Sequence, residues 1–215
     1  MLKENSVYTK PEMTQMLGTR SRQGINRKLK RYGVRFEVCG RGESAIYKIK
    51  EITDAFKVFA ILELGCDGNT VFTKLRNFYY HFFEDDIFMA MPDEVKEVRM
   101  REMKQDVSRQ TIATYIRRLE RNNLINRYTN NYIYYFANKD KQRMCEHSEY
   151  AQAWYNYWDD IASGLNCYDA IANMRADFGG VARKQPIPEI NGIYNEKIEY
   201  MLSLIQQSIE SEYEG

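Results

Sequence analysis

Two nearly identical stretches decide the fold of this 215-residue chain: SRQGI at residues 21–25 and SRQTI at residues 108–112. After each copy an apolar residue returns four positions beyond the isoleucine, and basic residues cluster over the next turns. Serine is a favourable N-cap because its hydroxyl accepts an otherwise unpaired amide at the start of a helix. Each copy therefore predicts a serine-capped helix, then a break, then an alternating segment that folds as a β-hairpin.

The segment before each copy predicts another helix and a tight turn. Thr9-Lys10-Pro11-Glu12 has the spacing of a capping box, and Gly18 can end the first helix in the left-handed conformation. Three residues later Ser21 opens the next helix. In the second copy a helix that opens at residues 92–94 precedes Ser108. Helix, tight turn, capped helix and hairpin are the successive elements of a winged helix-turn-helix.

The second copy resembles the recognition helix of many bacterial winged-helix proteins. The resemblance lies in Val107-Ser108-Arg109-Gln110-Thr111-Ile112, followed by Ile116, Leu119 and Asn122-Asn123-Leu124-Ile125. The first copy resembles such a helix less specifically, and together the copies cover about two thirds of the chain. The chain is thus similar to bacterial tandem winged helix-turn-helix DNA-binding proteins, which include transcription regulators and the replication initiators of plasmids or phages.

The expected fold class is mainly α with small β-hairpin wings (α+β), with two winged-helix modules and a C-terminal helical region. Residues 1–52 form the first winged helix in this prediction. Residues 53–140 form the second, with leading helices near 52–64 and 72–83 and a hairpin that turns at Asn130-Asn131. Residues 141–215 form an acidic, aromatic helical region.

In that C-terminal region we expect helices near residues 146–163 and 168–174, an irregular stretch over 179–188, and a last helix over about 194–211. The first of these carries an aromatic face. The last helix repeats apolar residues at helical spacing, from Ile198 to Ile209. It either packs on the chain's own core or pairs with a second copy, and we favour a homodimer through this helix.

The outer faces of the two SRQ helices carry side chains suited to reading bases. Glutamine can bond adenine twice, arginine can bond guanine twice, and a threonine methyl can meet thymine. The alternative is an ordinary solvated charged face. Arg41, between two glycines of the first hairpin turn, is suited to a phosphate or minor-groove contact. The candidate DNA-binding residues are Arg20, Ser21, Arg22, Gln23, Arg27, Lys30, Arg31 and Arg41, with Ser108, Arg109, Gln110, Thr114, Arg117, Arg118 and Arg121.

Charge is segregated along a chain whose formal net charge is only +1. Residues 1–50 carry 12 Lys and Arg against 4 Asp and Glu, and residues 101–145 carry 10 against 4. Residues 51–100 carry 5 against 10, and residues 146–215 carry 4 against 12. Both positive blocks coincide with the SRQ units, which favours duplex DNA as the partner.

Other classes of function find little support in the sequence. The four cysteines are far apart without a CxxC pair, and only two histidines are present, so we expect neither a disulfide framework nor a metal site. Nucleotide-binding and nucleophile motifs are absent from the sequence, so we expect no enzyme activity, catalytic residue or cofactor. The chain has no apolar run that could span a bilayer and no leader, so we expect a cytoplasmic protein without membrane contact.

The sequence predicts sequence-specific duplex DNA binding by two recognition helices, in a transcription regulator or a replication initiator of a bacterial or mobile-element system. The two reader faces differ, which favours a composite site over a simple palindrome. The alternative is a winged-helix module that binds a protein partner, such as an inhibitor of a host protein or ribonucleoprotein encoded on a mobile element.

Overall fold

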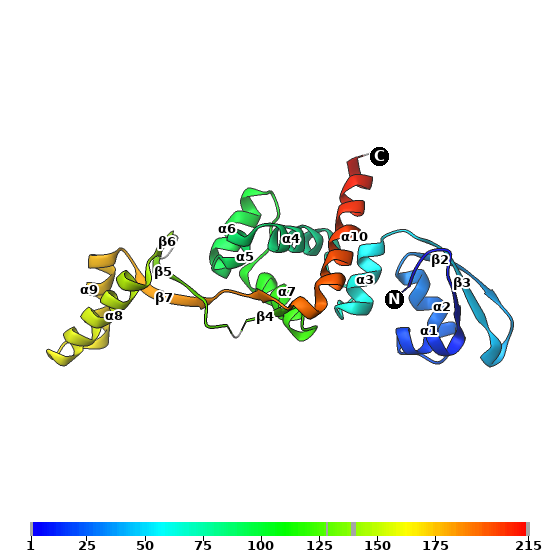
Figure 1. Ribbon diagram of the computed structural model, residues 1–215, viewed down its shortest axis with the longest axis horizontal. Coiled ribbons are helices and arrows are strands. Elements are labelled where there is room, and N and C mark those ends of the chain that lie inside the picture. Colours follow the sequence, from blue (N-terminus) through cyan, green and yellow to red (C-terminus); the bar gives the residue numbers. More distant parts are fainter. Residues whose placement is uncertain (1, 128, 139–140, 214–215) are drawn as a thin grey trace. The chain divides into compact units, whose positions relative to one another are not determined.

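The computed structural model describes residues 2–127, 129–138 and 141–213 and has a mixed α and β architecture (Figure 1). The chain divides into two compact units. Unit 1 comprises Met1–Tyr80, Thr114–Leu124 and Asn191–Gly215, and unit 2 comprises His81–Ala113 and Ile125–Ile190. The division at residues 52/53 and 140/141 stays a prediction.

Unit 1 begins with a small sheet and two helices. Strand β1 (Val7–Thr9) leads into α1 (Lys10–Leu17) and α2 (Arg22–Arg31), and the chain returns as β2 (Val34–Cys39) and β3 (Ile46–Ile52). The strands are antiparallel in the order β1-β3-β2, and a 3₁₀ turn η1 (Gly42–Ser44) lies between β2 and β3. The core between sheet and helices contains Met13, Leu17, Ile25, Leu29, Tyr47 and Ile49.

The predicted caps of these helices are confirmed. Thr9 and Glu12 form the reciprocal capping box, and Gly18 ends α1 in the left-handed conformation with φ of 60°. The Ser21 hydroxyl accepts the Gly24 amide at 3.0 Å and begins α2. The first hairpin also forms as predicted, because β2 pairs with β3 around Gly40 and Gly42, which both have positive φ.

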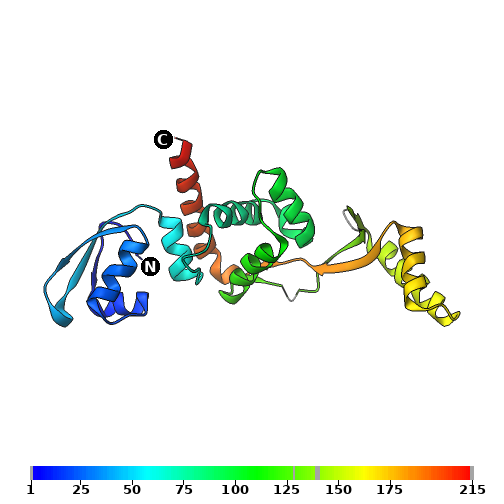
Figure 2. The same cartoon turned by 180° about the vertical axis from the view of Figure 1, so that it is seen from behind.

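The rest of unit 1 is helical. It contains α3 (Ala55–Glu63), the first turns of α4 (Phe72–Glu84), the second half of α7 (Arg109–Arg121), the short 3₁₀ turn η2 (Gly192–Tyr194) and α10 (Asn195–Tyr213). Helix α10 lies beside α3 in both views (Figures 1 and 2). The Phe59 and Tyr200 rings meet across this pair with centroids 6.0 Å apart.

The apolar stripe of α10 is buried within its own unit. Ile198, Met201, Leu204 and Ile205 are all buried, and Ile205 is completely inaccessible to solvent. Lys197 adds a 3.0 Å ion pair to Glu63 of α3. These side chains are therefore not available to a second copy, and the structure favours intramolecular packing over the homodimer that the sequence suggested.

Unit 2 contains the end of α4, then α5 (Asp86–Ala90), α6 (Asp93–Glu102) and the first turn of α7. The Asp85 carboxylate accepts the Phe88 amide and begins α5. The Ser108 hydroxyl accepts the Thr111 amide at 3.3 Å, so it occupies the position in α7 that Ser21 occupies in α2. The buried Lys96 of α6 donates a hydrogen bond to the carbonyl of Met91.

The second predicted hairpin is wrong. Strands β4 (Ile125–Asn126) and β5 (Tyr132–Asn138) do not pair with each other. Instead β4 pairs with β8 (Glu189–Ile190), and β5 lies between β6 (Lys141–Cys145) and β7 (Val181–Pro186), all antiparallel. Hydrogen bonds from Thr129 Oγ1 to the Ile187 carbonyl and from the Ile187 amide to the Asn131 carbonyl link the two pairings. A long ribbon of β4–β5 against β7–β8 results.

Two helices form a hairpin between β6 and β7, seen at the left of Figure 1: α8 (His147–Ala162) and α9 (Cys167–Phe178). Both helices were predicted, but the expected irregular stretch after them is strand β7 over most of its length. The core beneath the hairpin consists of Phe136, Ala153, Met174 and Ala182, with Tyr150, Trp154 and Tyr157 of α8 packed against it.

Gly180, where α9 gives way to β7, has no space for a side chain. A Cβ atom there would lie 2.9 Å from both the carbonyl carbon and the oxygen of Ala137 in β5. Gly180→Ala must therefore separate two paired strands, and we expect it to lower the free energy of unfolding by about 1–3 kcal/mol. Urea denaturation followed by circular dichroism measures this change. Gly192→Ala, with open space around it, is the matched control and should have little effect; equal stabilities would contradict the prediction.

Candidate nucleic-acid interface

Helix α2 carries the most exposed concentration of positive charge. Its ten residues, RQGINRKLKR, contain no acidic side chain. Ile25 and Leu29 are completely buried beneath it, which directs the opposite side outward. Gln23, Arg27 and Lys30 are exposed on that opposite side, and with the exposed Arg20 and Arg22 at the start of the helix they form what we call the α2 face. A helix of this length spans about 15 Å, and one face of it fits a DNA major groove about 12 Å wide.

The side chains of the α2 face are not engaged by acidic partners. Within residues 2–127, 129–138 and 141–213, none of Arg20, Arg22, Arg27 and Lys30 forms an ion pair. Lys28, on the inner side, donates instead to the Leu17 carbonyl at 2.6 Å. The cations of the α2 face are therefore exposed to solvent, directly after the short turn between α1 and α2.

The turn that leads into α2 is unusually tight, which explains the glycine in SRQGI. A Cβ on Gly24 would lie 2.4 Å from Thr19 Oγ1 and 2.8 Å from the capping Ser21 Oγ. In SRQTI the equivalent residue is Thr111, and its hydroxyl lies 3.0 Å from Ser108 Oγ. The two copies therefore share the serine cap but differ in how closely the preceding turn approaches the helix.

Arg31, another predicted DNA-binding residue, lies against the loop that follows α3. Its guanidinium lies so close to Gly68 that a Cβ on that glycine would meet Nη2 at 2.0 Å. Arg31 is exposed, yet it lies over the loop after α3 rather than within the α2 face.

The turn of the first hairpin adds an exposed cation. Arg41 is exposed at the turn between Gly40 and Gly42. The other charges of the hairpin largely pair with one another, as Arg35 does with Glu51 at 2.6 Å and Lys50 with Glu37 at 3.1 Å.

No residue of α1 was singled out from the sequence as a candidate DNA-binding residue. Lys10, Thr14 and Gln15 line a hollow of about 310 Å³ together with Arg20 and Glu43. Lys10 is held there by an ion pair with Glu43 at 2.6 Å. In helix-turn-helix proteins the first helix crosses the DNA backbone, so the position of α1 directly before α2 is the signal that could have pointed to these residues.

The predicted residues of α7 divide into two groups. Gln110, Thr114, Arg117 and Arg121 are exposed along the helix, as the helical periodicity predicted. Arg109 forms a 2.8 Å ion pair with Glu94, and Arg118 is half-buried with Nη1 3.5 Å from Thr70 Oγ1. Arg109 and Arg118 thus have polar partners on other elements, so within the described part of the chain α7 has fewer unpaired cations on its exposed side than α2.

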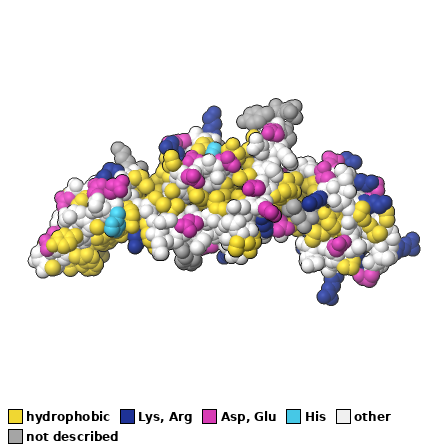
Figure 3. All heavy atoms as spheres, viewed as in Figure 1, with side chains coloured by type: hydrophobic (Ala, Val, Ile, Leu, Met, Phe, Trp, Pro, Cys, Tyr) yellow, Lys and Arg dark blue, Asp and Glu magenta, His cyan; other side chains and the backbone are white. Residues whose placement is uncertain are grey.

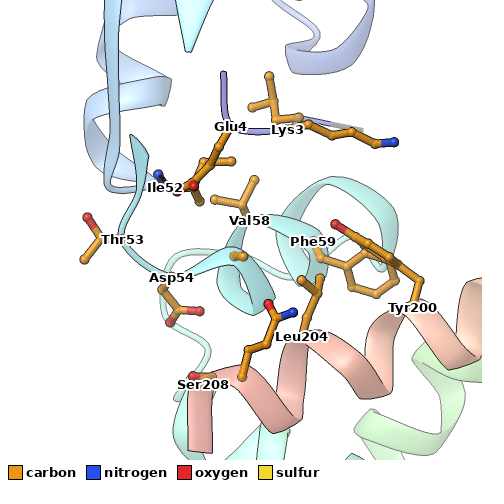
Figure 4. A pocket seen from close by; sticks show the side chains of 13 residues that line it. Lys3, Glu4, Ile52, Thr53, Asp54, Val58, Phe59, Tyr200, Leu204 and Ser208 are labelled. Carbon is orange, nitrogen blue, oxygen red and sulfur yellow. Dashed lines mark hydrogen bonds between the residues drawn. The ribbon is translucent and has the colours of Figure 1, made fainter. Parts of the chain in front are cut away.

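A separate cavity of about 490 Å³ lies in unit 1 between the N-terminal segment, α3 and α10 (Figure 4). Val58, Phe59 and Leu204 supply apolar lining, and Glu4 and Asp54 supply carboxylates. The carboxylate of Glu4 accepts the Ile52 amide at 2.7 Å, and that of Asp54 accepts the Lys57 amide at 2.8 Å. Because its carboxylates cap local backbone and its charge is not positive, this cavity is a poor match for nucleic acid.

Within the described residues, no three His, Cys, Asp or Glu side chains gather as a metal site would require. Over the same part of the chain, every helix is too short or too polar to cross a bilayer. Comparisons of the chain with known protein families, characterised proteins and solved structures find no match.

Proposed function

We propose that the protein binds duplex DNA through the α2 face, with Arg41 of the β2–β3 hairpin touching the backbone or the minor groove. The observation that carries the proposal is the set of exposed cations on α2 without acidic neighbours in the helix. Positive charge on one helix face releases counterions from DNA, and arginine and glutamine are the side chains that read guanine and adenine.

The order of elements in unit 1 supports a winged helix. The path β1, α1, α2, β2, β3 with sheet order β1-β3-β2 places a capped second helix beside a hairpin. In a winged helix-turn-helix that second helix enters the major groove while the hairpin flanks the duplex.

Helix α7 is proposed as a second reader with a smaller share of the affinity. It retains Gln110, Thr114, Arg117 and Arg121 on its exposed side, but two of its arginines are engaged elsewhere. Two unlike readers favour a composite DNA site, as an operator of a transcription regulator or an origin bound by a replication initiator would provide.

The test is selection of bound sequences from a random duplex pool, followed by affinity measurements at several salt concentrations. A DNA reader should enrich a defined sequence, and its affinity should fall steeply as salt rises. If no sequence is enriched and binding to random duplex is negligible, the alternative holds: the charged faces serve a protein partner.

We expect Arg27→Ala and Arg117→Ala each to cost about 1–3 kcal/mol of specific affinity and to relax base preference at different positions of one site. The two residues belong to different helices and are not equivalent in register, since Arg27 corresponds to Thr114. Repeating the selection with each variant measures the change in preference. A loss that is uniform across all sequences would contradict base reading by that arginine.

Arg41→Ala should behave differently from the helix variants. A backbone or minor-groove contact carries little sequence information, so we expect weaker binding to all duplexes and a salt dependence flatter by about one unit of slope. Titration of one specific and one random duplex over a salt series measures both effects. Arg35→Ala, at a residue already paired with Glu51, is the matched control. If the Arg41 variant keeps the wild-type slope, the hairpin does not touch DNA.

A further inference from the structure

Helix α8 has two apolar faces, of which only one is covered. Its inner face packs Tyr150, Ala153, Trp154 and Tyr157 into the core of the helical hairpin. Its outer face exposes Ala151, Tyr155, Trp158 and Ala162, with Tyr155 69% and Trp158 61% accessible. Figure 3 shows hydrophobic side chains gathered over this end of unit 2, at the left of the view.

The four outer residues follow one another at spacings of four, three and four, so they form a single stripe along the helix. We call them the α8 stripe. Single exposed apolar residues are common on protein surfaces, but an apolar stripe containing two large aromatic side chains marks a site of contact.

The α8 stripe is symmetric in spacing and in side-chain class, with a small residue at each end and two aromatic residues between them: Ala, Tyr, Trp, Ala. Its midpoint lies between residues 156 and 157. If a second α8 lies antiparallel at this midpoint, Ala151 faces Ala162 of the other copy and Tyr155 faces its Trp158. Small residues then meet small ones and aromatic residues meet aromatic ones, which allows close approach at both ends and ring contact in the centre. We propose that α8 pairs antiparallel with α8 of a second copy of this chain.

The charge of the helical hairpin argues against nucleic acid and anionic lipid as occupants. Residues 146–180 carry six Asp and Glu against a single Arg, so nucleic acid and anionic lipid are repelled. In the antiparallel register Asp159 and Asp160 lie at the level of Trp154 and Ala153 of the other copy. No carboxylate therefore faces its own counterpart, and the pairing avoids a direct like-charge contact.

The size of the surface sets the strength of the pair. Each aromatic side chain can bury about 150–250 Å², and two of them with two alanines give less than the roughly 800 Å² per partner of a stable complex. The dimer is therefore a weak one that forms at high protein concentration. Because both hairpins are acidic, it becomes stronger as salt rises, opposite to the salt dependence of DNA binding.

The first test is sedimentation velocity of the full chain over about 10–300 µM, a range suited to weak interfaces. We expect the wild type to change from monomer to dimer over this range and Trp158→Ser with Tyr155→Ser to remain monomeric. Tyr168→Ser, at an aromatic residue of α9 that is 84% accessible and outside the stripe, is the matched control and should still dimerise. Circular dichroism melting verifies that all three proteins are folded. A monomeric wild type, or a dimer unaffected by the stripe variant, would overturn the proposal.

The second test measures the register. With exposed Cys39 and Cys167 replaced by serine, a mixture of Ala151→Cys and Ala162→Cys chains should form an intermolecular disulfide under mild oxidation. Either variant alone should not, because eleven residues separate like positions by about 16 Å along the helix, beyond the reach of a disulfide. Crosslinking of one variant with itself would show a parallel pair and reject the register. Neither test uses DNA, so the dimer can fail or hold independently of the proposed function.

Discussion

Ile205→Asp is expected to unfold unit 1. Ile205 is completely inaccessible, on the side of α10 that packs on the unit's core beside Met201 and Leu204. The substitution removes apolar burial and places a carboxylate at a position that solvent does not reach. Burying a charge in this way costs several kcal/mol, and we expect a loss of at least about 4 kcal/mol from a domain whose whole stability is about 5–15 kcal/mol.

The measurement is urea denaturation of the wild type and of Ile205→Asp, monitored by circular dichroism and by limited proteolysis. Gln206→Asp is the matched control because Gln206 is the next residue of α10 and is exposed. It places an aspartate in the same turn of α10 without burying a charge. It also replaces the 3.4 Å hydrogen bond from Gln206 to Glu210 with two neighbouring carboxylates, but both side chains are exposed, so the variant should stay close to the wild-type midpoint. Deletion of residues 192–215 should likewise abolish folding of unit 1. A folded Ile205→Asp protein with a smaller mass in solution would instead revive the homodimer through α10.

A rise in stability between about pH 8 and pH 10.5 is the second large effect that we expect, and it depends on Lys96 of α6. The Lys96 side chain is completely buried. Its Nζ donates a hydrogen bond to the Met91 carbonyl and lies 5.9 Å from the centroid of the Phe82 ring. Burial lowers the pKa of Lys96 from the ordinary 10.5 to about 8, while Asp93, 3.9 Å away, acts in the opposite direction. The Arg127 charge also lowers this pKa, and Glu94 raises it.

The direction of the effect follows from proton binding. Below about pH 8 Lys96 is charged in both the folded and the unfolded chain, and the full cost of burying the ammonium is present. Between about 8 and 10.5 the unfolded chain keeps the proton that the folded chain releases, so raising the pH stabilises the folded state. The difference in pKa corresponds to about 3 kcal/mol.

Comparison with Lys96→Met isolates this contribution from other groups that titrate at high pH. We expect the stability of the wild type relative to the variant to increase by about 3 kcal/mol from pH 7 to pH 10.5. The Met91 carbonyl keeps a partner in the variant, because Gln185 Nε2 also donates to it at 3.3 Å. Lys48→Met, at an exposed lysine of β3, is the control and should show no such trend. A parallel pH dependence of wild type and Lys96→Met would contradict the prediction.

The candidate site was predictable from the sequence on α2 and less so on α7. On α2 the apolar residues Ile25 and Leu29 lie on one side of the helix and the polar residues between them lie on the other. The helical periodicity of the sequence was therefore enough to predict which cations are exposed. On α7 the same reasoning placed Arg117 correctly on the outside. It could not detect the pairing of Arg109 with Glu94 or the contact of Arg118 with Thr70, because those partners come from other elements.

The sequence by itself determined the local features of this protein. The caps at Thr9, Ser21 and Ser108 could be read directly, because every atom that forms them lies within a few residues along the chain. The hairpin around Arg41 could be read as well, because its two strands are adjacent in sequence and joined by a short turn that contains two glycines. These short-range bonds fix where the helices of the SRQ units begin.

Only the tertiary structure decided the long-range features. The partner of β4 and one of the two partners of β5 come more than 40 residues later, after an inserted helical hairpin. Alternating hydrophobicity indicates that a strand is half-buried, but it does not specify which strand pairs with it. For the same reason the apolar stripe of α10 could not distinguish the chain's own core from a second copy. The complete burial of Lys96 could not be predicted either, because it is a lysine in a largely polar helix. Its burial depends on which elements pack around α6 and not on the sequence of α6 itself.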